Sequence, residues 1–197
     1  MSRTLVVACG ALARELVALR RANGWEHVDI ACLPAHWHNT PERIVPGVEA
    51  RIIAARETHA RVLVAYGDCG TGGRLDAMLD RHGVERLPGA HCYAFFAGVE
   101  AFEALAEPEP GTFYLTDYLA ANFERLVMEE MGIRRHPELR DVYFAHYTRL
   151  LYLSQGAASG LADAERAAAA LDLPLVVHRT GLVPLADSLR HIRIAAA

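Results

Sequence analysis

The chain has 197 residues, enough to bury a conventional core without disulfide bonds. Apolar residues make up 52% of it and charged residues 22%, which excludes a disordered or fibrous protein. The 20 Lys and Arg residues against 24 Asp and Glu give a net charge of -4, so neither nucleic acid nor an anionic membrane is expected as a partner.

Short β-branched runs alternate with amphipathic stretches along the chain. In chain order, the expected strands cover residues 4–8, 27–32, 61–66, 112–115, 148–153 and 173–178. The expected helices cover residues 10–21, the second half of 41–58, 74–81, 117–131 and 161–171. Residues 91–96 fit either a short strand or the start of a helix. Pro46 and Gly47 are expected to delay the start of the helix in 41–58.

Strand–helix alternation of this kind predicts an α/β fold. We expect a mostly parallel central sheet with helices on both faces, a Rossmann-like three-layer sandwich. Pro108, Pro110 and Gly111 indicate a loop between two elements rather than a domain boundary. Residues 1–197 are therefore expected to form a single domain.

The pattern of apolar residues also predicts where in the cell the protein is located. No apolar run approaches the roughly 20 residues that span a bilayer, so no membrane partner is expected. Residues 1–7 lack the apolar stretch and cleavage site of a secretory signal, which predicts a cytoplasmic protein. In that reducing compartment, four cysteines do not indicate a disulfide framework, and each is a candidate buried thiol, nucleophile or metal ligand.

Three of the cysteines follow predicted strands or turns. Cys9 comes directly after the first strand, Cys69 follows the third strand after a two-residue step, and Cys92 follows the turn at Pro88 and Gly89. Ligands of parallel sheets bind outside the carboxyl ends of the strands, where the N-terminus of the next helix favours a thiolate. Three thiolates suit zinc or a [4Fe-4S] cluster and leave one coordination position open.

Packing is the competing interpretation, because free cysteine is among the most buried residue types. For Cys32, inside the apolar run 29–33, packing is favoured outright. For Cys9, Cys69 and Cys92 the flanking glycines and the shared sheet edge favour a common metal or cluster site.

Histidine and acidic residues near these cysteines are candidates for catalytic roles. His91, next to Cys92, fits a fourth ligand or an acid–base group. The loop after the second strand carries His36 and His38, of which at most one would face a site. Asp68, next to Cys69, fits either an outer partner of the metal ligands or a turn residue that bonds its own backbone.

Glycines at the same edge are candidates for cofactor binding. Gly10, Gly70 and Gly72 permit a bulky ligand or cluster to approach the backbone closely. The cluster of Gly70, Gly72 and Gly73 resembles a phosphate-binding loop, but it lacks the Lys and Ser/Thr of that motif. Two further expectations concern local structure: Thr116 or Asp117 caps a helix, and the aromatic segment 143–152 packs in the core.

Several short motifs together carry a family resemblance. They are Ala-Cys-Gly at 8–10, Leu-Pro-Ala at 33–35 with His38, Asn39 and Pro41, Tyr-Gly-Asp-Cys-Gly at 66–70, Gly-Ala-His-Cys at 89–92 and Gly-Thr-Phe-Tyr-Leu-Thr-Asp at 111–117. In combination they resemble the domain of unknown function numbered 1638, from the first strand to about Leu153. Cys9, Cys69 and Cys92 fall within these motifs, whereas Cys32 does not.

The resemblance implies a biological setting. Members of that family are often encoded among corrinoid-dependent methyltransferase systems, which implies a role beside cobalamin-linked methyl transfer, for example in methionine synthesis. It implies a corrinoid protein or methyltransferase component as partner, and contact with a corrinoid carried by that partner. The open position of a zinc ion held by three thiolates further predicts a small-molecule thiol as a ligand.

Three functional hypotheses follow. The first is a metal- or cluster-bearing protein that acts in or supports cobalamin-dependent methyl transfer. The second is a non-catalytic accessory of a corrinoid protein, with structural cysteines. The third is an enzyme acting on a small metabolite with Cys69 as nucleophile and His91 as base.

Overall fold

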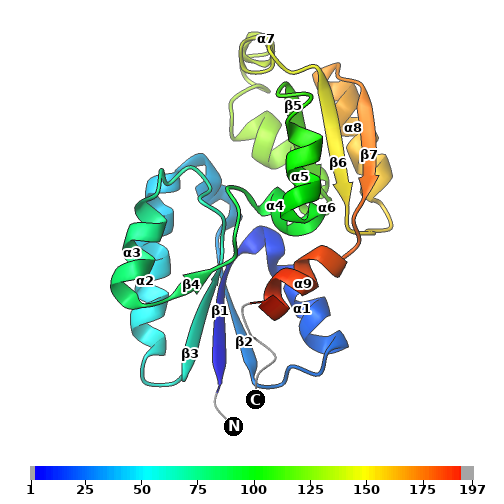
Figure 1. Cartoon of the computed structure of the whole chain (residues 1–197). Helices are drawn as coiled ribbons and strands as arrows, with labels where there is room; N and C mark the ends of the chain where they lie inside the picture. The colour runs from blue at the N-terminus through cyan, green and yellow to red at the C-terminus, as the bar shows by residue number, and fades with distance from the viewer. Residues whose placement is uncertain (1–2, 192–197) are drawn as a thin grey trace. The chain divides into compact units, whose positions relative to one another are not determined.

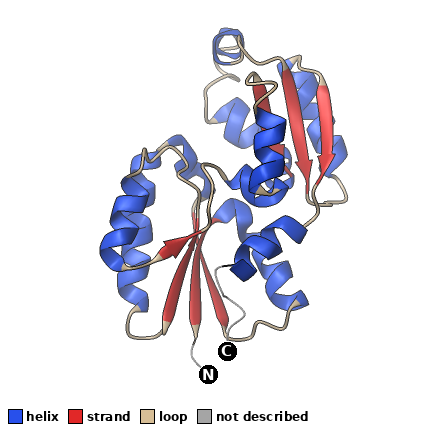
Figure 2. Ribbon diagram, viewed as in Figure 1, coloured by secondary structure: helices blue, strands red, loops and turns tan. Residues whose placement is uncertain are grey.

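The computed structural model describes residues 3–191, in which every strand pairing is parallel and helices surround the sheets (Figures 1 and 2). The expected α/β class is confirmed. The strands form two sheets, and the chain divides into two compact units, Met1–Phe95 with Pro184–Ala197 and Phe96–Val183. That the two fold together as a single domain stays a prediction. No helix in 3–191 is long and apolar enough to cross a bilayer.

The sheet of the first unit has four strands. In spatial order they are β2 (Val28–Leu33), β1 (Thr4–Cys9), β3 (Arg61–Ala65) and β4 (Glu85–Arg86). In register, Cys9 pairs with Leu33 and Ala8 with Ala65, so β1, β2 and β3 end nearly level. The segments that follow these three strands therefore start from one edge of the sheet.

All six residues of β1 are buried, because helices cover both faces of this sheet. In Figure 1, α2 (Ile44–Ala55) and α3 (Arg74–His82) lie on one side of the strands, and α1 (Ala13–Ala22) and α9 (Val183–His191) lie on the other. The shorter helices are η1 (Gly10–Leu12), η2 (Ala35–Asn39), η3 (Pro41–Arg43) and α4 (Cys92–Ala97). Because α4 begins at Cys92, the helix alternative for residues 91–96 is confirmed and the strand alternative is wrong.

The expected delay at Pro46 is wrong, because α2 already begins at Ile44. Proline is tolerated in the first turn of a helix, where its missing N–H has no intrahelical partner to lose. Gly47 has a packing role instead: a Cβ there would lie 2.3 Å from the Trp37 ring.

The second unit carries the sheet β5-β6-β7. Its elements are α5 (Val99–Ala106), β5 (Thr112–Thr116), α6 (Asp117–Ala121), the π-helical turn η4 (Glu124–Glu129), α7 (Glu138–Tyr143), β6 (Arg149–Ser154), α8 (Gly160–Leu171) and β7 (Leu175–Arg179). Three helices and one strand were not expected from the sequence: α5, α7, α9 and β4.

The expected helix over 117–131 is interrupted. It starts as expected, with the Thr116 hydroxyl accepting a hydrogen bond from the Leu119 N–H at 3.3 Å. It then ends at Ala121, where the Asn122 side-chain amide donates to the Tyr118 carbonyl at 2.8 Å. Such a bond from side chain to backbone competes with helix continuation, and the chain proceeds as a π-helical turn.

A buried carboxylate joins β5 and β6 in the second unit. Asp117 is 5% exposed and accepts hydrogen bonds from the Tyr152 hydroxyl at 2.5 Å and from the backbone N–H groups of Gln155 and Ala157. A Cβ at Gly160 would lie 2.0 Å from the Tyr152 hydroxyl oxygen, so only glycine fits there. The network compensates the desolvation of the carboxylate.

Replacing Tyr152 with phenylalanine should lower the free energy of unfolding by about 1–3 kcal/mol, because a buried carboxylate loses a hydrogen bond. Denaturant unfolding measures this. Tyr143→Phe is the matched control, since Tyr143 is 43% exposed, and it should leave the free energy unchanged. Equal effects of the two substitutions would contradict the role given to the Tyr152–Asp117 bond.

Candidate functional site

The three cysteines singled out in the sequence belong to the first unit and follow the strand ends of its sheet. Cys9 is the last residue of β1, Cys69 lies four residues beyond the end of β3, and Cys92 is the first residue of α4. Cys9 is 1% exposed and Cys69 is 8% exposed, whereas Cys92 is partly buried. Cys32, on the edge strand β2, is exposed.

The thiols of Cys9, Cys69 and Cys92 are close enough to influence one another. Desolvation by burial, above all, raises the pKa of Cys9 to about 12, and a charge on the Cys69 sulfur raises it further. Burial also raises the pKa of Cys92 well above its usual value, and the sulfurs of Cys69 and Cys9 add to that rise. A charge on Cys32 also raises the pKa of Cys9. Cys9, Cys69 and Cys92, which come from three separate segments, therefore lie within electrostatic reach of one another.

Backbone N–H groups point at two of these sulfurs. The Ala11 N–H donates to the Cys9 sulfur at 3.4 Å. Burial raises the pKa of Cys69 to about 11, but hydrogen bonds from backbone N–H groups of Gly67 and Cys92 act in the opposite direction. Such donors stabilise a thiolate relative to a thiol, which is what a metal ligand requires.

His38 is the histidine that reaches this cluster most closely. Its Nδ1 lies 2.9 Å from the Ala35 carbonyl oxygen and 3.8 Å from the Cys9 sulfur. A carbonyl only accepts, so Nδ1 carries the proton and Nε2 keeps a free lone pair. Burial lowers the pKa of His38, which favours this neutral form. A backbone carbonyl that orients an imidazole in this way is typical of metal-binding histidines.

Tyr66 is a member of the cluster that sequence reasoning missed. Its ring stacks on that of His38, with centroids 6.4 Å apart and an interplanar angle of 14°. The residue is 1% exposed, and its hydroxyl lies close enough to the Cys9 thiol to lower the pKa of that thiol, although it forms no hydrogen bond of normal geometry. A tyrosine immediately after a buried strand, three residues before Cys69, was the available signal.

His91 lies near His38 at the edge of the cluster. The residue is exposed, and its ring contacts that of Tyr93 at a centroid distance of 6.3 Å. Its charge contributes to lowering the pKa of His38, so the two imidazoles are neighbours. His36 is exposed on η2, in agreement with the expectation that one histidine of this loop at most faces the site.

Asp68 bonds its own loop. Its carboxylate accepts hydrogen bonds from the Thr71 hydroxyl at 2.9 Å and from the N–H groups of Gly72 and Gly73 at 3.1 and 2.8 Å. These bonds lower the pKa of Asp68, with the Gly73 N–H as the largest cause. The turn-residue interpretation of Asp68 is favoured, and the N–H groups of this loop are engaged within the chain rather than directed at a phosphate.

Close backbone contacts hold the cysteine-bearing segments together. A Cβ at Gly67 would lie 2.8 Å from the Ala90 carbonyl oxygen, and a Cβ at Gly10 would lie 3.0 Å from that of Leu33. The Cys69 N–H also donates to the Ala90 carbonyl at 3.2 Å. Cys69 itself has a positive φ of 49°, an uncommon conformation for a residue other than glycine.

Arg86 fastens the loop that leads to Cys92. Its guanidinium forms a two-point ion pair with Asp76 on α3 and donates to the Leu87 and Gly89 carbonyls, each at 2.9 Å. It is also the cation whose charge lowers the pKa of Cys69. One side chain therefore joins α3, β4 and the 87–89 loop.

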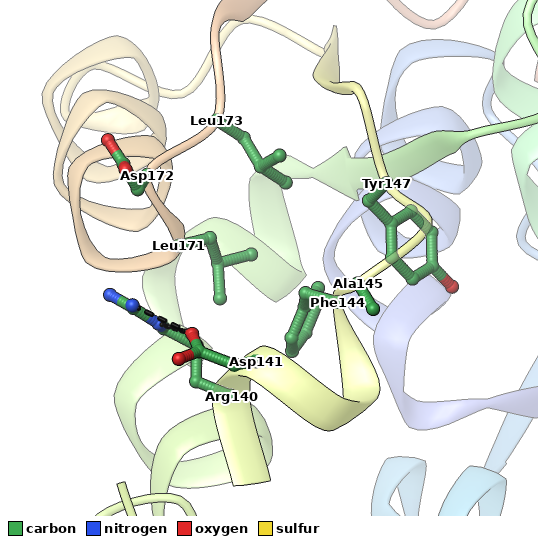
Figure 3. Close-up of a pocket in the computed structure, with 8 residues that line it drawn as sticks. All are labelled: Arg140, Asp141, Phe144, Ala145, Tyr147, Leu171, Asp172 and Leu173. Carbon is green, nitrogen blue, oxygen red and sulfur yellow. Dashed lines mark hydrogen bonds and ion pairs between the residues drawn. The ribbon is translucent and has the colours of Figure 1, made fainter. Parts of the chain in front are cut away.

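A hollow in the second unit is a weaker candidate. It has a volume of about 240 Å³, and Figure 3 shows Arg140 and Asp141 paired with each other at its rim, with Phe144, Tyr147 and Leu173 around it. Phe144 and Tyr147 both make edge contacts with Phe113 and a tilted contact with each other. The core-packing interpretation of this aromatic segment holds for Phe144 and Tyr152, which are buried, and is wrong for Tyr143 and Tyr147, which are exposed. No thiol lines this hollow, and Arg140 and Asp141 in its lining are already paired with each other.

The three sulfurs are neighbours but do not surround a single point. Within residues 3–191 no group of three Cys, His, Asp or Glu side chains stands in a metal-binding arrangement. Ligation by Cys9, Cys69 and Cys92 together would require thiol side chains to turn toward a common centre. The donor types nevertheless fit a thiophilic ion: three thiols and an imidazole with a free Nε2.

In metal-free protein, iodoacetamide should modify Cys32 first at pH 7.5, while Cys9 and Cys69 resist. Each unit of raised pKa lowers the thiolate fraction tenfold, so these two sites should react roughly 100-fold or more slowly than unperturbed thiols. Their rates should climb as the pH approaches 11–12. Mass spectrometry of the peptides measures this. Rapid modification of Cys69 at neutral pH would instead indicate an activated nucleophile.

Comparison with known proteins gives one match. The sequence profile described as "Protein of unknown function (DUF1638)" matches residues 32–189. The match extends beyond Leu153, where the motif resemblance ends, and it begins after β1, which carries Cys9. No curated protein and no solved structure matches the chain.

Proposed function

The chain belongs to the DUF1638 family, and from its thiol cluster we propose that it carries a metal centre held by Cys9, Cys69 and Cys92. The proposed group is a zinc ion or a [4Fe-4S] cluster. Three protein sulfurs leave one coordination position open in either case.

One observation carries this proposal: three thiols distant in sequence are collected where the strands of one sheet end, with Cys9 and Cys69 buried and Cys92 partly buried. Random burial of small apolar side chains would not select the ligand-binding edge three times. Backbone N–H donors and His38 at the same place are polar features that a purely apolar packing cluster does not need.

The electrostatics of the cluster support a cation. Burial and the charges of neighbouring thiolates both disfavour ionisation of the thiols in this cluster. Arg86 is the cation that favours ionisation of Cys69, and it is already paired with Asp76. A divalent cation deprotonates coordinating thiols, which reverses this balance. The raised pKa values equally disfavour Cys69 as a free nucleophile with His91 as its base.

His38 has two roles open to it beside the three sulfurs. Through Nε2 it is suited to serve as a ligand or to accept a proton from a molecule bound at the open position. Its tautomer is held by the Ala35 carbonyl, so neither role needs rearrangement of the ring protons. His91 is the more exposed of the two candidate histidines.

We assign this centre to cobalamin-dependent methyl transfer in the cytoplasm, in or beside a system such as methionine synthesis. The motif resemblance supports this setting, and free thiols suit a reducing compartment. When bound, zinc would supply Lewis acidity toward a small-molecule thiol, and a cluster would supply electron transfer to a corrinoid protein. A non-catalytic accessory of that corrinoid protein remains the alternative if the cysteines are structural.

Substitution of the ligands tests the proposal. Cys9→Ser, Cys69→Ser and Cys92→Ser should each weaken zinc binding by more than the roughly 10–100-fold that loss of an outer partner costs. Cys32→Ser is the control and should bind zinc like the wild type, because Cys32 is exposed on the edge strand. Competition with a chelator of known affinity measures the constants.

The colour of protein purified without oxygen separates the two groups. A brown, iron-containing sample would identify the cluster, and a colourless zinc-containing one would identify zinc. Wild-type protein that takes up neither group, with all four Ser variants functioning in cells, would leave the accessory role and overturn the metal centre.

A further inference from the structure

The Tyr66 hydroxyl stands out among the buried polar groups of the first unit. Tyr66 is 1% exposed, yet its hydroxyl forms no hydrogen bond of normal geometry among the described residues. Leaving such a donor unpaired inside a protein costs as much as losing a hydrogen bond. A phenylalanine would fill the same space without that cost, so packing alone does not account for the hydroxyl.

The position of the Tyr66 ring limits the possible hydrogen-bond partners of its hydroxyl. Tyr66 directly follows β3, and its ring stacks on His38, whose Nδ1 lies 3.8 Å from the Cys9 sulfur. The hydroxyl lies beside that same sulfur, close enough to favour its ionised form. The Nδ1 of His38 already donates to the Ala35 carbonyl. The Cys9 sulfur is therefore the neighbouring atom that can still accept a hydrogen bond from the Tyr66 hydroxyl.

The chemistry of that sulfur changes when it binds a metal. A protonated thiol is a weak acceptor, which agrees with the absence of a hydrogen bond of normal geometry from the Tyr66 hydroxyl. A metal-bound thiolate is a strong acceptor, and it already receives the Ala11 N–H from one side. A small movement of Cys9 toward the phenol would complete the bond.

We propose that the Tyr66 hydroxyl donates a hydrogen bond to the metal-bound thiolate of Cys9 and thereby sets the electron donation of this ligand. The inference rests on the proposed metal centre. Tyr66 is a positioning residue: it acts through Cys9 and does not bind the metal. Donors of this kind orient ligands and tune the metal in known metal sites.

Tyr66→Phe in the full chain, loaded with Co²⁺ as a spectroscopic probe, tests the inference. The substitution should weaken Co²⁺ binding by about 10–100-fold, as expected for loss of an outer partner. It should also move the sulfur-to-cobalt charge-transfer absorption to longer wavelength, because a thiolate without the donor releases its electrons more easily. Loss of stability alone would not change the energy of that absorption.

Two companion measurements keep the test decisive. Tyr118→Phe, a substitution in the second unit, should leave both affinity and absorption unchanged. Incorporating 3-fluorotyrosine at position 66 keeps the fold and strengthens the donor, so the absorption should move to shorter wavelength.

The outcomes separate the two claims. If wild-type protein shows no sulfur-to-cobalt absorption, the metal centre itself is wrong. If the wild type shows it and both Tyr66 replacements leave its energy and the affinity unchanged, the metal centre stands and the role of Tyr66 is overturned.

Discussion

Burial of cysteine thiols at the ends of parallel strands is the constraint on which this site depends. Burial makes ionisation of Cys9 and Cys69 so costly that both stay protonated at neutral pH. A cluster of this kind has two stable conditions: neutral thiols, or thiolates neutralised by a cation. The fold thus links metal binding to the charge state of its own interior.

The backbone around the cluster keeps the three segments in place. Gly67 lets the loop after β3 pass against Ala90, and the Cys69 N–H bonds the same carbonyl. Arg86 fixes the 87–89 loop, which leads to Cys92, through the Leu87 and Gly89 carbonyls and Asp76. Because these contacts involve backbone and a paired guanidinium rather than the sulfurs, they position the thiols without occupying them.

Much of this arrangement could be predicted from the sequence, for clear physical reasons. Buried parallel strands are recognisable in the sequence as runs of β-branched residues. Because the carboxyl ends of parallel strands meet at one edge of the sheet, Cys9 and Cys69 could be placed together there. Asp68 shows the limit of that reasoning, because only the folded loop reveals that its carboxylate bonds the N–H groups of Gly72 and Gly73. Tyr66 was missed because His38 and Cys9, its neighbours in the fold, lie far away in the chain. Arg86 was missed although its partners Asp76, Leu87 and Gly89 lie within ten residues of it, because only the folded loop brings them to one guanidinium.

The errors in the expected elements have local causes. The start of α2 at Ile44 shows that proline in a first turn does not delay a helix. The break after Ala121 arises from a side-chain amide that bonds the backbone, which periodicity does not register. The short elements β4 and α7 carry too few residues for an apolar period to emerge.

X-ray absorption spectroscopy at the metal edge of the anaerobically purified full chain tests the central claim most directly. The account predicts one bound zinc or iron centre whose nearest neighbours include three protein sulfurs at about 2.3 Å. A bound metal surrounded only by oxygen and nitrogen atoms, or a chain that retains no metal under these conditions, would contradict it.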